Sequence, residues 1–217
     1  MPNCATLSRF KLVTFRFLVA ALLIGAAGNA TNGQVVFDDA NGNASNSGAV
    51  PTSINLLLGS NIVNGTVTSP ANTRNFYTFN IGANEQLSAI ELLTLNVTTA
   101  TGGASSDPGF FALVSGTTSA TPAAGGGVFA NLGGELFDPS DLNTNLLLEI
   151  SGGGITDDGT GFSTLGQGDY TFVIQQTGDE ISNFSLDFQV TSVAIPEPTS
   201  GIALAALGLT GLVRRRR

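Results

Sequence analysis

The chain lacks the side chains on which most catalytic and metal sites depend. Among its 217 residues there is no histidine and no tryptophan, and the single cysteine is Cys4. Without histidine or a mature cysteine, the commonest general base, thiol catalysis and most transition-metal sites are removed. No Gly-x-Ser-x-Gly elbow is present, and no glycine-rich run is followed by Lys-Ser or Lys-Thr. A pair of carboxylates of the glycosidase type stays open, but the acidic residues lie mostly in turn-like contexts. We therefore expect no enzyme.

Positive charge is also missing from the body of the chain. The chain has eight basic residues and sixteen acidic ones, and only Arg74 among the basic residues lies within 31–213. All sixteen acids lie in that same stretch, which gives it a net charge of −15. Such a body repels phosphate backbones, so we expect no nucleic-acid partner.

The first thirty residues have the pattern of a secretory signal peptide. Arg9, Lys11 and Arg16 precede an apolar stretch at 17–27, and small residues follow it. We expect cleavage by signal peptidase after Ala30; an uncleaved membrane helix is the alternative. Cys4 precedes the apolar stretch and would leave with the leader. The exported protein would then have no disulfide, and its stability would rest on packing.

The last residues combine three ordered features. Pro196, Glu197 and Pro198 precede an uncharged apolar run at 199–213, and Arg214, Arg215, Arg216 and Arg217 follow it. As a helix this run would rise about 1.5 Å per residue, roughly 22 Å in all, against a bilayer core of about 30 Å. The arginine cluster would stay on the cytoplasmic side. We expect a short transmembrane helix with the preceding chain outside.

This arrangement at 195–217 resembles the sorting tail of bacterial PEP-CTERM proteins. The resemblance implies export, a transient stop in the inner membrane, and cleavage near the Pro-Glu-Pro by an exosortase. It assigns Pro196, Glu197 and Pro198 to the sorting motif and the four arginines to membrane retention. An ordinary C-terminal membrane anchor is the alternative, but it explains neither the Pro-Glu-Pro nor the short helix.

Between leader and tail, short runs with period-two alternation are separated by Gly, Asn and Asp turns. Residues 31–52 read as a flexible segment with at most one strand, and 128–137 as a region with one short strand. About eight or nine strands and no convincing internal helix predict an all-β domain at 53–194, an antiparallel β-sandwich of the jelly-roll or Ig-like kind. The clearest expected strands are 54–58, 61–67, 74–81, 87–97, 109–114, 146–150, 169–175 and 183–193.

The middle of the chain also weakly resembles the bacterial pre-peptidase C-terminal β-sandwich modules. The resemblance rests on the aromatic strand at 75–79, the acidic loop with Asp157 and Asp158, and the strand that begins Gly168-Asp169-Tyr170. Asparagines at positions 72 and 75 stand where those modules usually have aspartate. The resemblance implies a non-catalytic accessory or binding module.

Calcium is the one metal that the composition permits, because it needs only oxygen ligands. Asp138 and Asp141 gather in one loop together with two asparagines, and Asp157, Asp158 and Asp169 lie in another. Neither loop has the spacing of an EF-hand. The alternative is ordinary turn chemistry, in which Asp and Asn bond their own backbone. No other cofactor is expected.

Two functions of different class follow from these features. The first is an exported cell-surface or extracellular-matrix protein, structural or adhesive, that associates with exopolysaccharide or with other surface proteins. The second is a carbohydrate-binding module for extracellular polysaccharide. Sugar platforms usually present exposed aromatic rings, and here tryptophan is absent and the tyrosines are Tyr77 and Tyr170. That scarcity favours the first function.

Overall fold

The computed structural model describes residues 33–68, 74–99, 101–103, 109–119, 132–150, 161–176 and 178–194. They belong to one compact unit at 31–217, separate from a unit at 1–30. The predicted signal peptide, with Ala30, and the predicted tail helix at 199–213 lie outside the described residues. Within the described ranges, no helix is both long enough and apolar enough to cross a bilayer.

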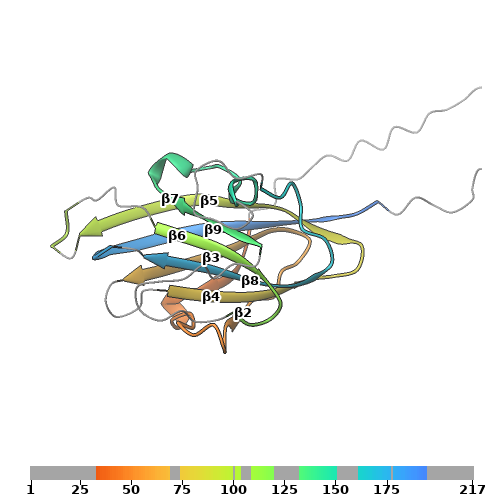
Figure 1. Ribbon diagram of the computed structural model, residues 1–217, viewed down its shortest axis with the longest axis horizontal. Coiled ribbons are helices and arrows are strands. Elements are labelled where there is room, and N and C mark those ends of the chain that lie inside the picture. Colours follow the sequence, from red (N-terminus) through yellow and green to blue (C-terminus); the bar gives the residue numbers. More distant parts are fainter. Residues whose placement is uncertain are drawn as a thin grey trace, which may run out of the picture. The chain divides into compact units, whose positions relative to one another are not determined.

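In the part of the chain that the structure describes, nine strands form two sheets (Figure 1). Sheet A has the order β1-β3-β9-β5, and sheet B has the order β2-β4-β8-β6-β7. The central ladders are antiparallel, whereas β1 joins β3 and β2 joins β4 in parallel. The predicted all-β sandwich is therefore confirmed, with a parallel strand added at one edge of each sheet. The strands are β1 (Gln34–Asp38), β2 (Thr52–Ser53), β3 (Gly59–Thr68), β4 (Arg74–Ile81), β5 (Glu85–Thr99), β6 (Gly109–Ser115), β7 (Gly133–Phe137), β8 (Gly168–Gln176) and β9 (Glu180–Ser192).

The inward faces of the two sheets share one hydrophobic core. Strand β9 alternates as its sequence predicts, since Phe184, Leu186, Phe188 and Val190 are all buried. The Phe188 ring meets Phe79 of sheet B at a centroid distance of 5.5 Å. Packing contacts of this kind between side chains of the facing sheets hold the two sheets together without disulfides.

Strand β4 also follows its sequence pattern. Tyr77, Phe79 and Ile81 point into the shared core, whereas Phe76 packs on the other face of sheet B in a small cluster with Phe110. The strand pairs with β8 over its whole length, and Phe79 lies opposite Tyr170. The two aromatic segments with similar sequences, 76–81 and 169–174, are thus direct neighbours in sheet B.

Strand β5 is one long strand with two irregularities in its pairing with β9, between Leu87 and Ala89 and between Leu92 and Thr94. A bulge adds a residue to one strand and changes which side chain faces the core. Here the second irregularity moves the inward positions from Ile90 and Leu92 to Leu95 and Val97, and Thr94 is left exposed. The run of leucines, ambiguous in sequence, fits an extended strand for this reason.

The predicted strand at 146–150 is wrong: the segment forms a short helix, α1 (Leu146–Glu149). Asn145 caps it by accepting a hydrogen bond from the Leu147 N–H. Leu146, Leu147 and Ile150 are buried, and Leu148 is exposed. Burial at i, i+1 and i+4 is the spacing of one helical turn, whereas a strand would have buried position 148.

The expected strand at 54–58 is also wrong, because the sheet pairing in this region is confined to β2 at Thr52–Ser53. The backbone of Leu57 is instead held by the side chain of Asn61, whose Oδ1 accepts from the Leu57 N–H at 2.8 Å. The strand allowed within 31–52 is β1, followed by a 3-10 turn, η1 (Asp39–Asn41). The sandwich therefore begins near Gln34, ahead of the expected boundary at 53.

Candidate functional site

The described part of the chain ends directly after its last strand. Strand β9 ends at Ser192, and the Val193 N–H then donates to the Asn84 carbonyl at 2.7 Å. Asn84 lies in the turn between β4 and β5 and has a φ of 65°, a left-handed conformation that asparagine tolerates. The backbone of Val193 is thus fastened to the turn at this end of the sandwich.

This hydrogen bond limits the distance between the domain and the predicted sorting motif. Pro196 follows Val193 by three residues, and an extended chain spans at most about 3.6 Å per residue. Pro196 is therefore within roughly 11 Å of Val193. Pro196, Glu197, Pro198 and the arginines Arg214, Arg215, Arg216 and Arg217 themselves lie outside the described residues.

An open cleft of about 400 Å³ lies among segments from both sheets. Its lining is mostly polar and includes two carboxylates, Glu85 and Asp169. The other lining residues are Ser53, Ile54, Asn55, Leu56, Thr78, Phe79, Asn80, Gly82 and Thr117. A polar cleft with hydroxyl, amide and carboxylate groups suits a ligand rich in hydroxyl groups.

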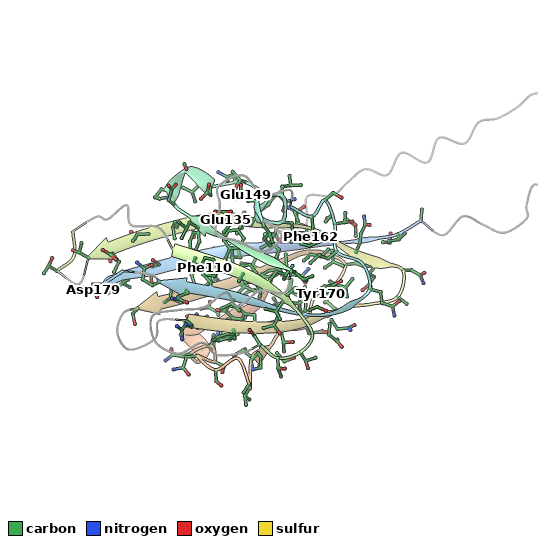
Figure 2. The ribbon with its side chains drawn as sticks, in the orientation of Figure 1. Phe110, Glu135, Glu149, Phe162, Tyr170 and Asp179 are labelled. Carbon is green, nitrogen blue, oxygen red and sulfur yellow. The ribbon has the colours of Figure 1, made fainter. Side chains whose placement is uncertain are left out.

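Hydrogen bonds fix the side chains of this cleft. Asn80 Nδ2 donates to Asp169 Oδ1 at 2.7 Å, and Glu85 Oε2 accepts from the Gly82 N–H at 3.1 Å. Tyr170, labelled in Figure 2, follows Asp169 and donates its hydroxyl to the Gly166 carbonyl. Its ring centroid lies 5.9 Å from that of Phe79. Asp169 and Glu85 thus hold the local backbone and side chains in place, and each retains acceptor capacity for a hydroxyl group.

The two predicted calcium loops are only partly described. Asp138 and Asp141 form a capping box around the 3-10 turn η2 (Pro139–Asp141). Asp138 Oδ1 accepts from the Ser140 N–H and hydroxyl, both at 2.6 Å, and Asp141 Oδ2 accepts from the Asp138 N–H. These bonds, led by that of the Ser140 hydroxyl, lower the pKa of Asp138. At this loop, hydrogen bonds to the local backbone account for both carboxylates, as the alternative to calcium binding expects.

Asp157 and Asp158 lie outside the described residues, so nothing tests their place in a calcium loop. Within the described ranges, no group of three or more His, Cys, Asp or Glu side chains is arranged to hold a metal ion. Asp169, which the sequence groups with the second loop, lies in the cleft with Asn80. Calcium binding at 157–158 stays a prediction.

The comparisons with known proteins bear on the tail. Residues 194–217 match the family model of the PEP-CTERM protein-sorting motif, which confirms the resemblance drawn from the Pro-Glu-Pro, the apolar run and the arginines. The motif supports export and processing by an exosortase, with a surface or extracellular location. No curated protein and no solved structure matches the chain. The resemblance of the middle region to pre-peptidase modules gains no support.

The sequence pointed to the tail but not to the cleft. Its lining comes from four strands, β2, β4, β5 and β8, and from the loops beside them, and no local motif marks residues such as Thr78, Thr117 and Glu85 as neighbours. The one available signal was Gly168-Asp169-Tyr170, which places a carboxylate at the start of an aromatic strand.

Proposed function

We propose that this chain is a non-catalytic cell-surface or extracellular-matrix protein, released or displayed by an exosortase, whose β-sandwich has a structural or adhesive role beside exopolysaccharide. The observation that carries the proposal is the sorting motif at 194–217, which starts as soon as β9 ends. Signal peptidase and exosortase are its processing partners, and the inner membrane holds it only transiently.

The construction of the domain supports a structural role. Its core is an aromatic and aliphatic interior shared by the two sheets, with no cysteine available for cross-links. The stretch 31–213 carries a net charge of −15, which keeps such a protein soluble outside the cell. Neutral polysaccharides and other surface proteins are suitable neighbours for it, whereas strongly anionic polymers are repelled.

The proposal is tested by determining both ends of the protein in a host with its exosortase. We expect the mature N-terminus within a few residues of Thr31 and a C-terminus near Pro196-Glu197-Pro198. Replacing these three residues by alanine should leave uncut protein in the inner membrane. Replacing Arg214–Arg217 by serine should loosen retention and release unprocessed protein. A mature surface form that still ends in Arg217 would make the tail a permanent anchor and contradict the assignment.

A second candidate, carbohydrate binding, is favoured by the polar cleft. Hydroxyl groups of a neutral sugar match its Thr, Asn, Asp and Glu side chains, and Phe79 forms part of the wall. We expect Thr117→Arg, which fills the cleft with a long side chain, to abolish retention on neutral polysaccharide in a pull-down. Asn183→Arg, at an exposed position on β9, is the matched control. Equal retention of both variants would remove the cleft as a sugar site.

A further inference from the structure

Strand β5 is an edge strand of sheet A, and only its first part is covered. Leu87 exchanges two backbone hydrogen bonds with Leu165, and Leu92 accepts one from the Asn143 N–H. A further bridge joins Glu91 to Asn145. Beyond Leu92, no segment in the described ranges pairs with β5 on the side away from β9 as far as Thr98. At Thr99 the strand ends in a turn, where the Thr99 N–H donates to the Gly103 carbonyl and the Thr99 carbonyl accepts from the Gly102 N–H. Figure 1 shows this part of β5 running out to the far end of the sheet.

Past the irregularity between Leu92 and Thr94, the open part of this edge has none of the features by which proteins usually protect an edge strand. Natural edges are kept from pairing by lysine, proline, bulges or inward-pointing charges. The segment 93–99 reads Leu-Thr-Leu-Asn-Val-Thr-Thr, with no charge, no proline and no glycine. Its β-branched residues favour an extended chain. The segment is therefore ready to accept another strand.

The charge of the molecule points to what that strand is. Two copies of a body with a net charge of −15 repel each other over most of their surfaces. They can approach where charge is absent, and 93–99 is such a place on an open edge. A partner strand rich in lysine would instead be attracted to the acidic surfaces elsewhere. An uncharged edge on an acidic protein thus suits a second copy of the same edge.

The segment is also self-complementary when it is laid antiparallel to itself. Centred on Asn96, the pairing sets Leu95 opposite Val97 of the other copy and Thr94 opposite Thr98. Leu95 packs against the core and Val97 is buried, whereas Thr94 and Asn96 are exposed on the outer face. Apolar side chains therefore meet apolar ones on the inner face, and hydroxyl and amide groups meet on the outer face.

We propose that two copies pair through β5, antiparallel and centred on Asn96, so that the two four-stranded sheets A become one continuous sheet. The contact is two-fold and isologous, which closes the assembly as a dimer. It goes beyond the proposed function, because it concerns the folded domain and requires no processing of the tail. Whether the protein is exported is measured separately, by cell fractionation.

Cysteine cross-linking tests the register. The test uses full-length protein that also carries Cys4→Ser. Directly opposed residues of an antiparallel pair have Cα atoms about 4.5–5.5 Å apart, which is within reach of a disulfide. We expect Asn96→Cys to form a cross-linked dimer on mild oxidation. A mixture of Thr94→Cys and Thr98→Cys chains should give a heterodimer in excess over either homodimer. Asn64→Cys, on β3 two strands away from β5, should stay monomeric.

A charge placed at the two-fold axis tests the energetics. Asn96→Lys puts two lysines opposite each other and should weaken dimerisation at least about tenfold, as measured by sedimentation of the full chain in mild detergent. Asn64→Lys, also on the outer face of sheet A, should dimerise like the parent. Because both variants keep the tail, association through the tail would affect both equally. Three results would each overturn the proposal. They are equal dimerisation of all three proteins, a monomeric parent protein, and cross-linking of Asn96→Cys to Val35→Cys on the β1 edge instead of to itself.

Discussion

The rings of Phe172 and Phe188 meet edge to face, with centroids 5.7 Å apart and an interplanar angle of 87°. Phe172 belongs to β8 of sheet B and Phe188 to β9 of sheet A, and both are fully buried. Each is on a central strand of its sheet. The pair therefore joins the two layers at the middle of the core.

Removing one ring of this pair should destabilise the domain severely. Phe188→Ala leaves a cavity next to Phe172 and Phe79 and should lower the free energy of unfolding by about 3–5 kcal/mol. Ser185→Ala, on the same strand but half-exposed, should change it by no more than about 0.5 kcal/mol. Urea denaturation of the exported protein measures both. A loss below about 1 kcal/mol for Phe188→Ala would contradict the role of this contact.

The side chain of Asn61 holds the entry to β3. Its Nδ2 donates to the carbonyls of Leu57, Gly59 and Phe188, at 2.7, 3.0 and 3.0 Å. Asn61→Leu keeps the size but leaves buried backbone groups unsatisfied, at a cost of about 2–4 kcal/mol. Faster hydrogen exchange at the Leu57 amide should accompany the loss. Asn64→Ala, half-buried on the outer face, is the control and should leave that amide unchanged.

The two tyrosines should resist ionisation at their usual pH. Burial raises the pKa of Tyr77 well above its ordinary value of about 10, with the charge of Asp39 as a second cause; burial also raises that of Tyr170. A raised tyrosine pKa gives stability that is present below pH 10 and is lost as the pH rises above it. We therefore expect the free energy of unfolding to fall as the pH rises above 10, and to fall less steeply with pH in the Tyr77→Phe variant.

With only two tyrosines and no tryptophan, absorbance of the phenolate reports this directly. In the Tyr170→Phe variant, the remaining signal should appear only together with loss of the sheet signal in circular dichroism. Ionisation of Tyr77 near pH 10 in a protein that stays folded would contradict its burial.

Asp138 should stabilise its loop as a cap. Asp138→Ala removes the acceptor of two Ser140 hydrogen bonds and should cost about 1 kcal/mol at neutral pH. Because these bonds lower the pKa of Asp138, its contribution is present above the unfolded value of about 3.9 and is lost as the pH falls through the folded value. The difference between variant and parent should therefore shrink below pH 4. A constant difference in urea midpoints down to pH 2 would reject the cap.

Calcium at 157–158 is tested by thermal melting with millimolar calcium and with chelator. We expect a small upward shift with calcium that Asp157→Asn with Asp158→Asn abolishes. Asp138→Ala should leave the shift in place, because that carboxylate is engaged in the capping box. Identical melting midpoints for the parent in both conditions would remove calcium from the account.

The strands that sequence predicted best are those whose two faces differ most. In β9 and β4, apolar and polar residues alternate because one face meets the core and the other does not, and this is visible in a single strand. Segment 146–150 has too few polar residues for that test. Its helix is decided by Asn145, which bonds both the Leu147 N–H and the Ile90 N–H of β5. That second contact is fixed by the fold and cannot be read locally.

The tail could be predicted from local sequence, whereas the cleft and the strand pairing depend on contacts between distant segments. The tail is a local motif, so its residues are adjacent in sequence and were recognised together. The cleft is formed where β2, β4, β8, the start of β5 and neighbouring loops converge, and its composition follows from strand order. The parallel addition of β1 and β2 also depends on which edges remain after the antiparallel strands have paired. Hydrophobic patterning does not determine such choices.

The position of the tail also decides how the domain carries load. β9 lies between β3 and β5 and pairs with both over most of its length, and in the sequence Val193 directly precedes the sorting motif at 194–217. If the tail is held in a bilayer, as proposed from the sorting motif, a pull on the domain enters along the axis of β9. Antiparallel hydrogen bonds run perpendicular to their strands, so this pull shears the two flanking ladders as a whole and cannot open them one bond at a time. The proposed attachment thus reaches the domain through a strand that is paired on both sides.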